Sequence, residues 1–285
     1  MKLLRYGPPG LEKPALLADD GSMRDLSQHV LDISPRMLGP KVLDELRALD
    51  PATLPKVEGD VRIGPPIAAI GKIVCVGLNY ADHAKESNLP VPGEPVLFMK
   101  ATSAICGPND AVIIPRGAQK TDWEVELGIV IGRRAQYIER KHAMDYVAGY
   151  CIVNDVSERD FQHERGGSWD KGKGCDTFAP IGPWLVSADE VNDLHNLDLC
   201  LSVNDEVRQR GNTSTMIFSI DEIVSYVSQF MTLNPGDVIC TGTPPGVGAG
   251  MQPPQFLKPG DRMRLSISGL GEQCQDVVTW RPTEA

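Results

Sequence analysis

The stretch TDWEVELGIVIG, residues 121–132, organises the rest of the chain. Apolar and acidic residues alternate through its first half and β-branched residues fill its second half, which is the pattern of a strand with one polar face. In a strand, Glu124 and Glu126 point to the same side, so their carboxylates can converge. The apolar residues of the first half point to the opposite side, towards a core.

The paired glutamates indicate a metal site. Two neighbouring carboxylates repel each other unless a cation lies between them or one of them is protonated. Carboxylate oxygens suit hard cations such as Mg²⁺, Mn²⁺ or Ca²⁺. The alternative is a solvated strand face that carries two unrelated charges, and the stretch alone leaves both interpretations open.

A third carboxylate follows a second predicted strand. The sequence VAGYCIVND, residues 147–155, is apolar and ends in Asp155, far enough along the chain for one excursion and a return. A third oxygen ligand beside the glutamate pair would complete a site with open positions for water or substrate. The alternative for Asp155 is the N-cap of the helix predicted over residues 157–165.

Composition excludes several classes of protein. The chain has 285 residues, of which 41% are hydrophobic and 23% charged, as expected for a globular fold. A net charge of −10 argues against nucleic acid or an anionic membrane as the partner. No apolar run is long enough to span a bilayer, and the first ten residues do not resemble a signal peptide. The seven scattered cysteines are therefore interpreted as reduced thiols of a cytoplasmic protein.

Two domains are expected, a small one over residues 1–66 and a main one over residues 67–285. Residues 51–66 contain four prolines, which is a linker composition. The many glycines and prolines indicate a turn-rich, mostly β protein. Elements are predicted as strands over 2–6, 15–18, 73–78 and 96–100, helices over 40–50 and 220–231, and a hairpin that turns at Asn204-Asp205.

Two further segments could carry chemistry. His83 and Glu86 share one face of a helix predicted to begin at Tyr80, which is the outline of a general-base pair. The residues alone favour the alternative, a surface helix with an ordinary ion pair. The loop TGTPPGVG, residues 241–248, exposes backbone N–H groups and two hydroxyls that could hold a carboxylate, or it is a rigid turn.

Four motifs occur together in one order. They are VGLNY at 76–80 followed by His83 and Glu86, DWEVEL at 122–127, NDVSERD at 154–160 and TGTP at 241–244. In this order they resemble the fumarylacetoacetate hydrolase superfamily over about residues 70–280. The resemblance implies an α+β, mostly β fold, a mixed β-roll around a metal site, in a homodimer.

The resemblance also implies roles for individual residues. The cation would be Mg²⁺, or else Mn²⁺ or Ca²⁺, held by Glu124, Glu126 and Asp155. The catalytic residues would be His83 and Glu86, which activate water, and Lys173, which supports an enolate. Contacts with a small diketo-acid substrate are implied for Tyr80, Lys100, Arg159, Gln162 and Thr243.

Three further stretches, at residues 3–7, 167–178 and 256–261, look like bacterial members often labelled ureidoglycolate lyase. For that subgroup the implied reaction is hydrolysis of 2,4-diketo-3-deoxy sugar acids of the L-fuconate or L-rhamnonate series. Arg208, Gln209 and Asn212 are hypothetical contacts of the sugar-acid tail, and so is the loop over residues 89–95. Alternatives on the same site are an oxaloacetate decarboxylase, an isomerase or the lyase, and outside enzymes a metal-stabilised binding protein.

Overall fold

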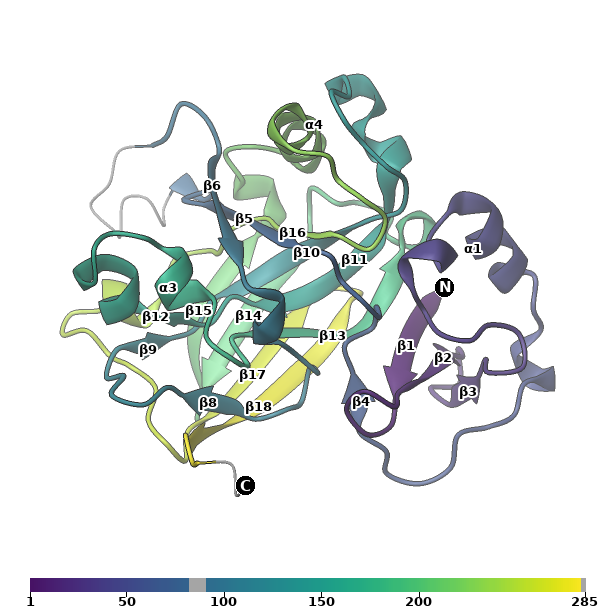
Figure 1. The fold of residues 1–285 in the computed structure, drawn as a ribbon, viewed down its shortest axis with the longest axis horizontal. Helices are drawn as coiled ribbons and strands as arrows, with labels where there is room; N and C mark the ends of the chain where they lie inside the picture. The colour runs from purple at the N-terminus through teal and green to yellow at the C-terminus, as the bar shows by residue number, and fades with distance from the viewer. Residues whose placement is uncertain (82–90, 283–285) are drawn as a thin grey trace.

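A large mixed β-sheet forms the centre of the computed structural model, which describes residues 1–81 and 91–282. Its strand order is β3-β2-β1-β13-β11-β10-β16-β5-β6, with β4 beside β1 and β7 beside β13 (Figure 1). The strands are β1 (Lys2–Tyr6), β2 (Lys13–Leu17), β3 (Met23–Asp25), β4 (Ile63–Gly64), β5 (Ile73–Gly77), β6 (Val96–Lys100), β7 (Ile105–Cys106), β10 (Val125–Ile131), β11 (Val147–Asn154), β13 (Ala179–Ser187) and β16 (Val238–Cys240).

A second, five-stranded sheet has the order β15-β14-β17-β18-β8, and β12 and β9 form a separate pair. These strands are β8 (Val112–Ile114), β9 (Thr121–Asp122), β12 (Ser157–Glu158), β14 (Asp198–Val203), β15 (Glu206–Asn212), β17 (Arg262–Ile267) and β18 (Gly271–Thr279). The α-helices are α1 (Pro40–Arg47), α3 (Asp170–Lys173) and α4 (Ile220–Phe230). Short 3₁₀ or π turns cover Pro35–Met37, Pro51–Thr53, Thr102–Ala104, Arg140–Tyr146, Asp160–Glu164, Ala188–Glu190, Thr213–Thr215 and Gly248–Gly250. The mostly β architecture predicted from the sequence is confirmed.

Strand β10 lies inside the large sheet, where it pairs with β11 on one side and β16 on the other. Every residue of β10 is buried, because both faces of the sheet are covered at this position. The strand predicted over residues 121–132 is therefore present, but it is interrupted between β9 and β10 at Trp123-Glu124. Glu124 and Glu126 are only 5% and 1% exposed, so the solvated-face interpretation is wrong.

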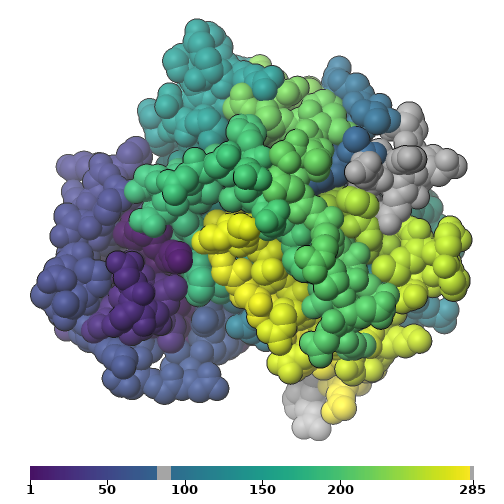
Figure 2. Space-filling view, turned by 180° about the vertical axis from the view of Figure 1, so that it is seen from behind, coloured from purple at the N-terminus to yellow at the C-terminus, as the bar shows by residue number. Residues whose placement is uncertain are grey.

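The N-terminal strands continue the same large sheet. Strand β1 pairs with β13, with Lys2 opposite Val186, and β2 and β3 extend the sheet beyond β1. In Figure 2, which shows the molecule from behind, this purple segment forms one flank. The expectation that residues 1–66 form a separate domain stays a prediction.

Most of the other predicted elements are confirmed, including helix α4 and the hairpin between β14 and β15. Asn204 and Asp205 adopt φ values of 52° and 63°, as a tight primed turn requires. The helix predicted over residues 157–165 is wrong in part, because β12 comes first and only a π turn, Asp160–Glu164, follows. No helix in the ranges 1–81 and 91–282 is long and apolar enough to cross a membrane.

Packing around β10 generates a prediction about stability. Ile129 is completely buried, so Ile129→Ala is expected to lower the free energy of unfolding by about 2–5 kcal/mol through lost burial and a residual cavity. Leu31 is 97% exposed and serves as the matched control, since Leu31→Ala should change stability by less than about 0.5 kcal/mol. Urea unfolding of both variants measures the difference, and equal stabilities would contradict the assignment of β10 to the core.

Candidate metal centre

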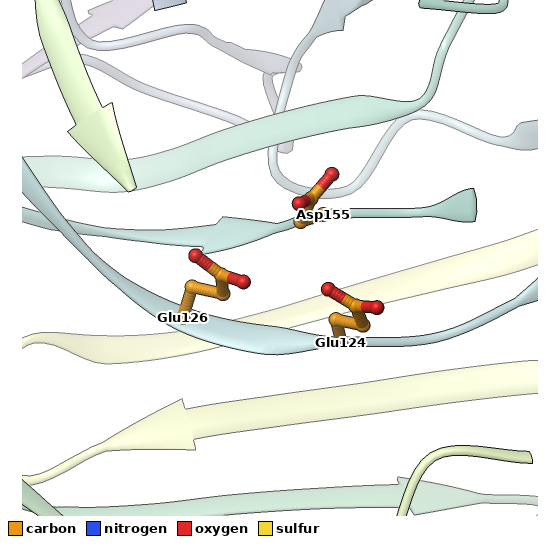
Figure 3. A group of neighbouring side chains, drawn as sticks. All are labelled: Glu124, Glu126 and Asp155. Carbon is orange, nitrogen blue, oxygen red and sulfur yellow. The ribbon is translucent and has the colours of Figure 1, made fainter. Parts of the chain in front are cut away.

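Three buried carboxylates converge beside the junction of β10 and β11. Glu124 and Glu126 point from one strand towards Asp155, which comes from the neighbouring strand (Figure 3). One oxygen from each of the three lies within 4.8 Å of the others. The register explains the convergence: Val125 is opposite Asn154, and the Asp155 N–H donates to the Glu124 carbonyl at 2.9 Å. The sequence-based grouping of these three residues is confirmed.

Cationic side chains surround this cluster. Lys173 Nζ lies 2.9 Å from Glu124 Oε2 and 2.8 Å from Asp155 Oδ2, so its ammonium bridges two of the carboxylates. Lys100 donates to the other oxygen of Asp155 and to the Val156 carbonyl. Arg159 contacts the remaining oxygen of Glu124, with Nη2 2.7 Å from Oε1.

Burial shifts the ionisation of these groups. Burial, together with the neighbouring charges of Asp155 and Glu124, raises the pKa of Glu126 well above its usual value. For Lys173, burial alone would lower the pKa, but the Asp155 and Glu124 carboxylates outweigh it and the net shift is upward. The carboxylates therefore favour the ammonium form of Lys173, whereas the repulsion from Asp155 and Glu124 disfavours the ionised form of Glu126.

The donor set fits a hard divalent cation. All three groups offer carboxylate oxygen, and they converge without a sulfur or imidazole ligand among them. Of the three, Glu126 accepts a backbone N–H but is the one for which no lysine or arginine contact is found among the described residues. A cation between the three carboxylates would relieve the repulsion that raises its pKa.

The loop over residues 241–248, called the threonine loop from here on, contacts Glu126. The Gly242 N–H donates to Glu126 Oε2 at 2.8 Å. Gly242 has a φ of +96°, and a Cβ placed there would lie 2.8 Å from the Cβ of Asn79. Only glycine fits this position, so the loop is shaped to bring a backbone donor to Glu126.

A fourth carboxylate, which sequence reasoning did not single out, anchors the arginine. Asp122 is completely buried and accepts from Arg159 Nε at 2.8 Å. It also accepts from the Gly248 and Ala249 N–H groups at 2.7 and 3.0 Å. Asp122 thus fixes both Arg159 and the end of the threonine loop, at Gly248 and the adjacent Ala249. Its place in the DWEVEL motif was the only signal of this role in the sequence.

A cavity of about 420 Å³ opens onto the cluster. Glu124, Glu126 and Lys173 line one part of it. Phe98 and Trp169 add an apolar part to the lining, where their rings meet edge to face with centroids 5.4 Å apart; the Phe98 ring centroid lies 4.9 Å from Lys173 Nζ. The cavity therefore combines a charged part with an apolar part, as small-molecule sites commonly do.

The structure brings most of the predicted site residues to this cavity, including Arg159, Gln162 and Thr243. The ammonium of Lys100 is instead directed to Asp155, and Lys100 supports a candidate ligand rather than lining the cavity. The buried Tyr80 hydroxyl has no hydrogen-bond partner in the described structure, and burial, followed by the charge of Glu126, raises its pKa. His83 and Glu86 lie outside the described residues.

The three hypothetical tail contacts do not reach the cavity. Arg208, Gln209 and Asn212 are absent from its lining among the described residues. Gln209 is completely buried, and its side chain bonds to Val125, Thr243 and Pro244 instead. The expectation that Gln209 contacts a substrate is therefore wrong.

The fold and the site define a mostly β protein with a buried carboxylate cluster open to a cavity. The chain belongs to the fumarylacetoacetate hydrolase family, since the family model described as fumarylacetoacetate (FAA) hydrolase C-terminal matches residues 72–278. A Burkholderia multivorans protein named only as a hydrolase, without a substrate, is 60% identical over 96% of this chain and 98% of its own length.

Solved structures agree over the whole chain. Fumarylacetoacetate hydrolase from Exiguobacterium antarcticum is 36% identical, with a TM-score of 0.87 over 98% of this chain and all of that chain. Maleylpyruvate hydrolase from Sphingobium sp. SYK-6, in complex with manganese(II) and pyruvate, is 30% identical, with a TM-score of 0.81 over 99% and 100% of the two chains. The 2-hydroxyhepta-2,4-diene-1,7-dioate isomerase from Mycobacterium marinum is 34% identical, with a TM-score of 0.74 over 98% of each chain.

The cluster predicts opposite effects of one substitution on metal binding and on stability. Glu126→Gln should weaken Mn²⁺ binding by at least about 10-fold, because a ligand charge is lost. Without metal it should raise the melting temperature, because the repulsion with Asp155 and Glu124 disappears. Calorimetric titration and thermal unfolding in chelator measure the two effects.

The control is Glu158→Gln. Glu158 is also completely buried, but its oxygens accept from the Lys120 N–H and the Thr121 hydroxyl, outside the cluster. Its substitution should leave Mn²⁺ affinity unchanged. Equal losses of affinity in the two variants would show that the cluster is not the binding site.

Proposed function

We propose that this protein hydrolyses the C3–C4 bond of a 2,4-diketo-3-deoxy sugar acid of the L-fuconate or L-rhamnonate series, giving pyruvate and L-lactate. The observation that carries the proposal is the cluster of Glu124, Glu126 and Asp155, with Lys173 between two of its members, at the edge of a cavity. The related maleylpyruvate hydrolase, in complex with manganese(II) and pyruvate, supports a site for a pyruvate unit.

The two sugar series share one substrate at this step. L-Fuconate and L-rhamnonate differ in configuration at C2 and C4, and both carbons are carbonyls in the diketo acid. The remaining stereocentre, C5, carries a hydroxyl and the terminal methyl group. The apolar part of the cavity, with Phe98 and Trp169, is suited to that methyl group.

The chain's own residues supply most of the chemistry. His83, oriented by Glu86, is proposed to take a proton from water as the water oxygen bonds to C4. The C3–C4 bond then breaks, its electron pair stays on C3 as the enolate of pyruvate, and a proton returned to C3 completes pyruvate. The Lys173 ammonium lies where it can stabilise the enolate charge. A divalent cation, for which we propose Mg²⁺, would supply Lewis-acid stabilisation of the oxygens of the pyruvate unit.

The second candidate is an enolate-forming reaction without an attacking water. The structural likeness to 2-hydroxyhepta-2,4-diene-1,7-dioate isomerase supports an isomerase as this second candidate. Such a reaction needs the same cation and the same Lys173. It does not need a residue that deprotonates water, so the two candidates differ in their dependence on His83.

Product analysis tests the proposal. The purified protein is incubated with 2,4-diketo-3-deoxy-L-fuconate and Mg²⁺, and pyruvate and L-lactate are measured over time. We expect equal amounts of both, with formation abolished by excess chelator and restored by Mg²⁺. Oxaloacetate and acetylpyruvate serve as comparison substrates. Carbon dioxide from oxaloacetate without cleavage of the sugar acid would contradict the hydrolase assignment.

The proposed general base generates a separate prediction. His83→Ala should lower the rate of hydrolysis by about 10²–10⁴-fold, because the attacking water loses its proton acceptor. Its Mn²⁺ affinity should equal that of the unchanged protein, since His83 is not one of the proposed ligands. His142→Ala is the control, because His142 is an exposed histidine paired with Asp145 and should hydrolyse normally. Undiminished hydrolysis in His83→Ala would remove the base from the mechanism.

A further inference from the structure

A buried glutamine of the five-stranded sheet reaches the start of β10, behind the carboxylate cluster. Gln209 belongs to β15, at the edge of the five-stranded sheet, whereas the candidate ligands belong to the large sheet. Its side chain is completely buried, and it bonds to Val125 of β10 and to the loop that follows β16. The Oε1 atom accepts from the Val125 N–H at 2.9 Å, and Nε2 donates to Thr243 Oγ1 at 2.8 Å and to the Pro244 carbonyl at 2.7 Å.

Val125 is the residue between the two glutamate ligands, and it lies where a neighbouring strand is missing. The pairing of β10 with β16 runs from Val130 only to Gly128, because β16 ends at Cys240. Beyond that point the backbone of Val125 is satisfied by side chains. Gln209 accepts its N–H, and Thr243 Oγ1 donates to its carbonyl at 3.0 Å. The buried groups would otherwise be unpaired.

These contacts close a ring through Gln209, Val125 and Thr243. The Thr243 hydroxyl donates to Val125 and accepts from Gln209, so each member bonds to the other two. The residue before Thr243 is Gly242, whose N–H bonds to Glu126. The ring therefore fixes the segment that bears both glutamates relative to the loop that holds one of them.

We propose that Gln209 is a positioning residue of the metal centre: it holds the Glu124–Glu126 segment and the threonine loop in the arrangement that a divalent cation requires. Residues that orient ligands from outside typically change metal affinity when they are removed. Gln209 does not touch the cavity, so its effect reaches the cation only through Val125 and Thr243. The proposal rests on the metal centre and not on the choice of substrate.

The test compares two glutamines with the same burial. Gln209→Met keeps the approximate side-chain volume and removes the three side-chain hydrogen bonds to Val125, Thr243 and Pro244. Gln273→Met is the matched control, because Gln273 is also completely buried and its Nε2 donates to the Ile152 and Gly182 carbonyls, away from the ring. Mn²⁺ affinity of the full chain is measured by calorimetric titration and by electron paramagnetic resonance of the free ion.

We expect Gln209→Met to weaken Mn²⁺ binding by about 10–100-fold. Gln273→Met should lower the melting temperature but keep the affinity within about 2-fold of the unchanged protein, because Gln273 reaches the Glu124 N–H only through two further side chains, Gln275 and Asn154. Unchanged affinity in Gln209→Met, or an equal loss in Gln273→Met, would overturn the proposal. Failure of the unchanged protein to bind Mn²⁺ would refute the metal centre itself.

Thr243→Val provides a second route if Gln209→Met does not fold. It removes the hydroxyl that links Gln209 to Val125 and should weaken Mn²⁺ binding by about 10-fold. The double variant should bind about as weakly as Gln209→Met alone, because both substitutions break the same ring. Losses that multiply, or full affinity in Thr243→Val, would show that the ring does not position the ligands.

Discussion

Repulsion among three buried carboxylates is the constraint on which the surrounding structure depends. Glu124, Glu126 and Asp155 converge at buried positions, and each would be costly to keep ionised alone. The neighbouring cationic side chains meet part of that cost. They reach Glu124 and Asp155 directly. Glu126 instead accepts the Gly242 N–H, and no lysine or arginine among the described residues contacts it. This unequal compensation is what makes the cluster receptive to a divalent cation.

The charges also favour an anionic substrate once a cation is bound. Arg159, Lys100 and Lys173 already face the three ligand carboxylates, and Asp122 neutralises part of Arg159 from behind. A bound divalent cation would add two positive charges, and the cluster with its surrounding side chains would then carry a net positive charge. Under the proposed function, this net charge would attract a carboxylate such as that of a 2-oxo acid. Metal binding and substrate recognition are therefore electrostatically linked.

Much of this centre could be predicted from the sequence because its signals are local. A period of two residues places Glu124 and Glu126 on one side of a strand, and an apolar run that ends in Asp155 brings a third oxygen to a strand end. The supporting residues leave no such pattern. Gln209 lies 84 residues from Val125, and their contact exists only because two sheets pack together. Lys100 was predicted to contact the substrate. It contacts Asp155 instead, and nothing in the sequence of its strand indicates that Asp155 lies within reach.

The end of β16 explains why the start of β10 needs a long-range contact from the second sheet. Val125 and Glu126 both pair with β11 on one side, but on the other side both lie beyond the end of β16. A strand extended in that direction would pair the backbone, yet it would fill the space that Thr243 and the cavity occupy. Side chains from the second sheet satisfy the same backbone groups in less space. The interrupted ladder thus keeps the cavity open, and rigidity lost from strand pairing is recovered through buried hydrogen bonds.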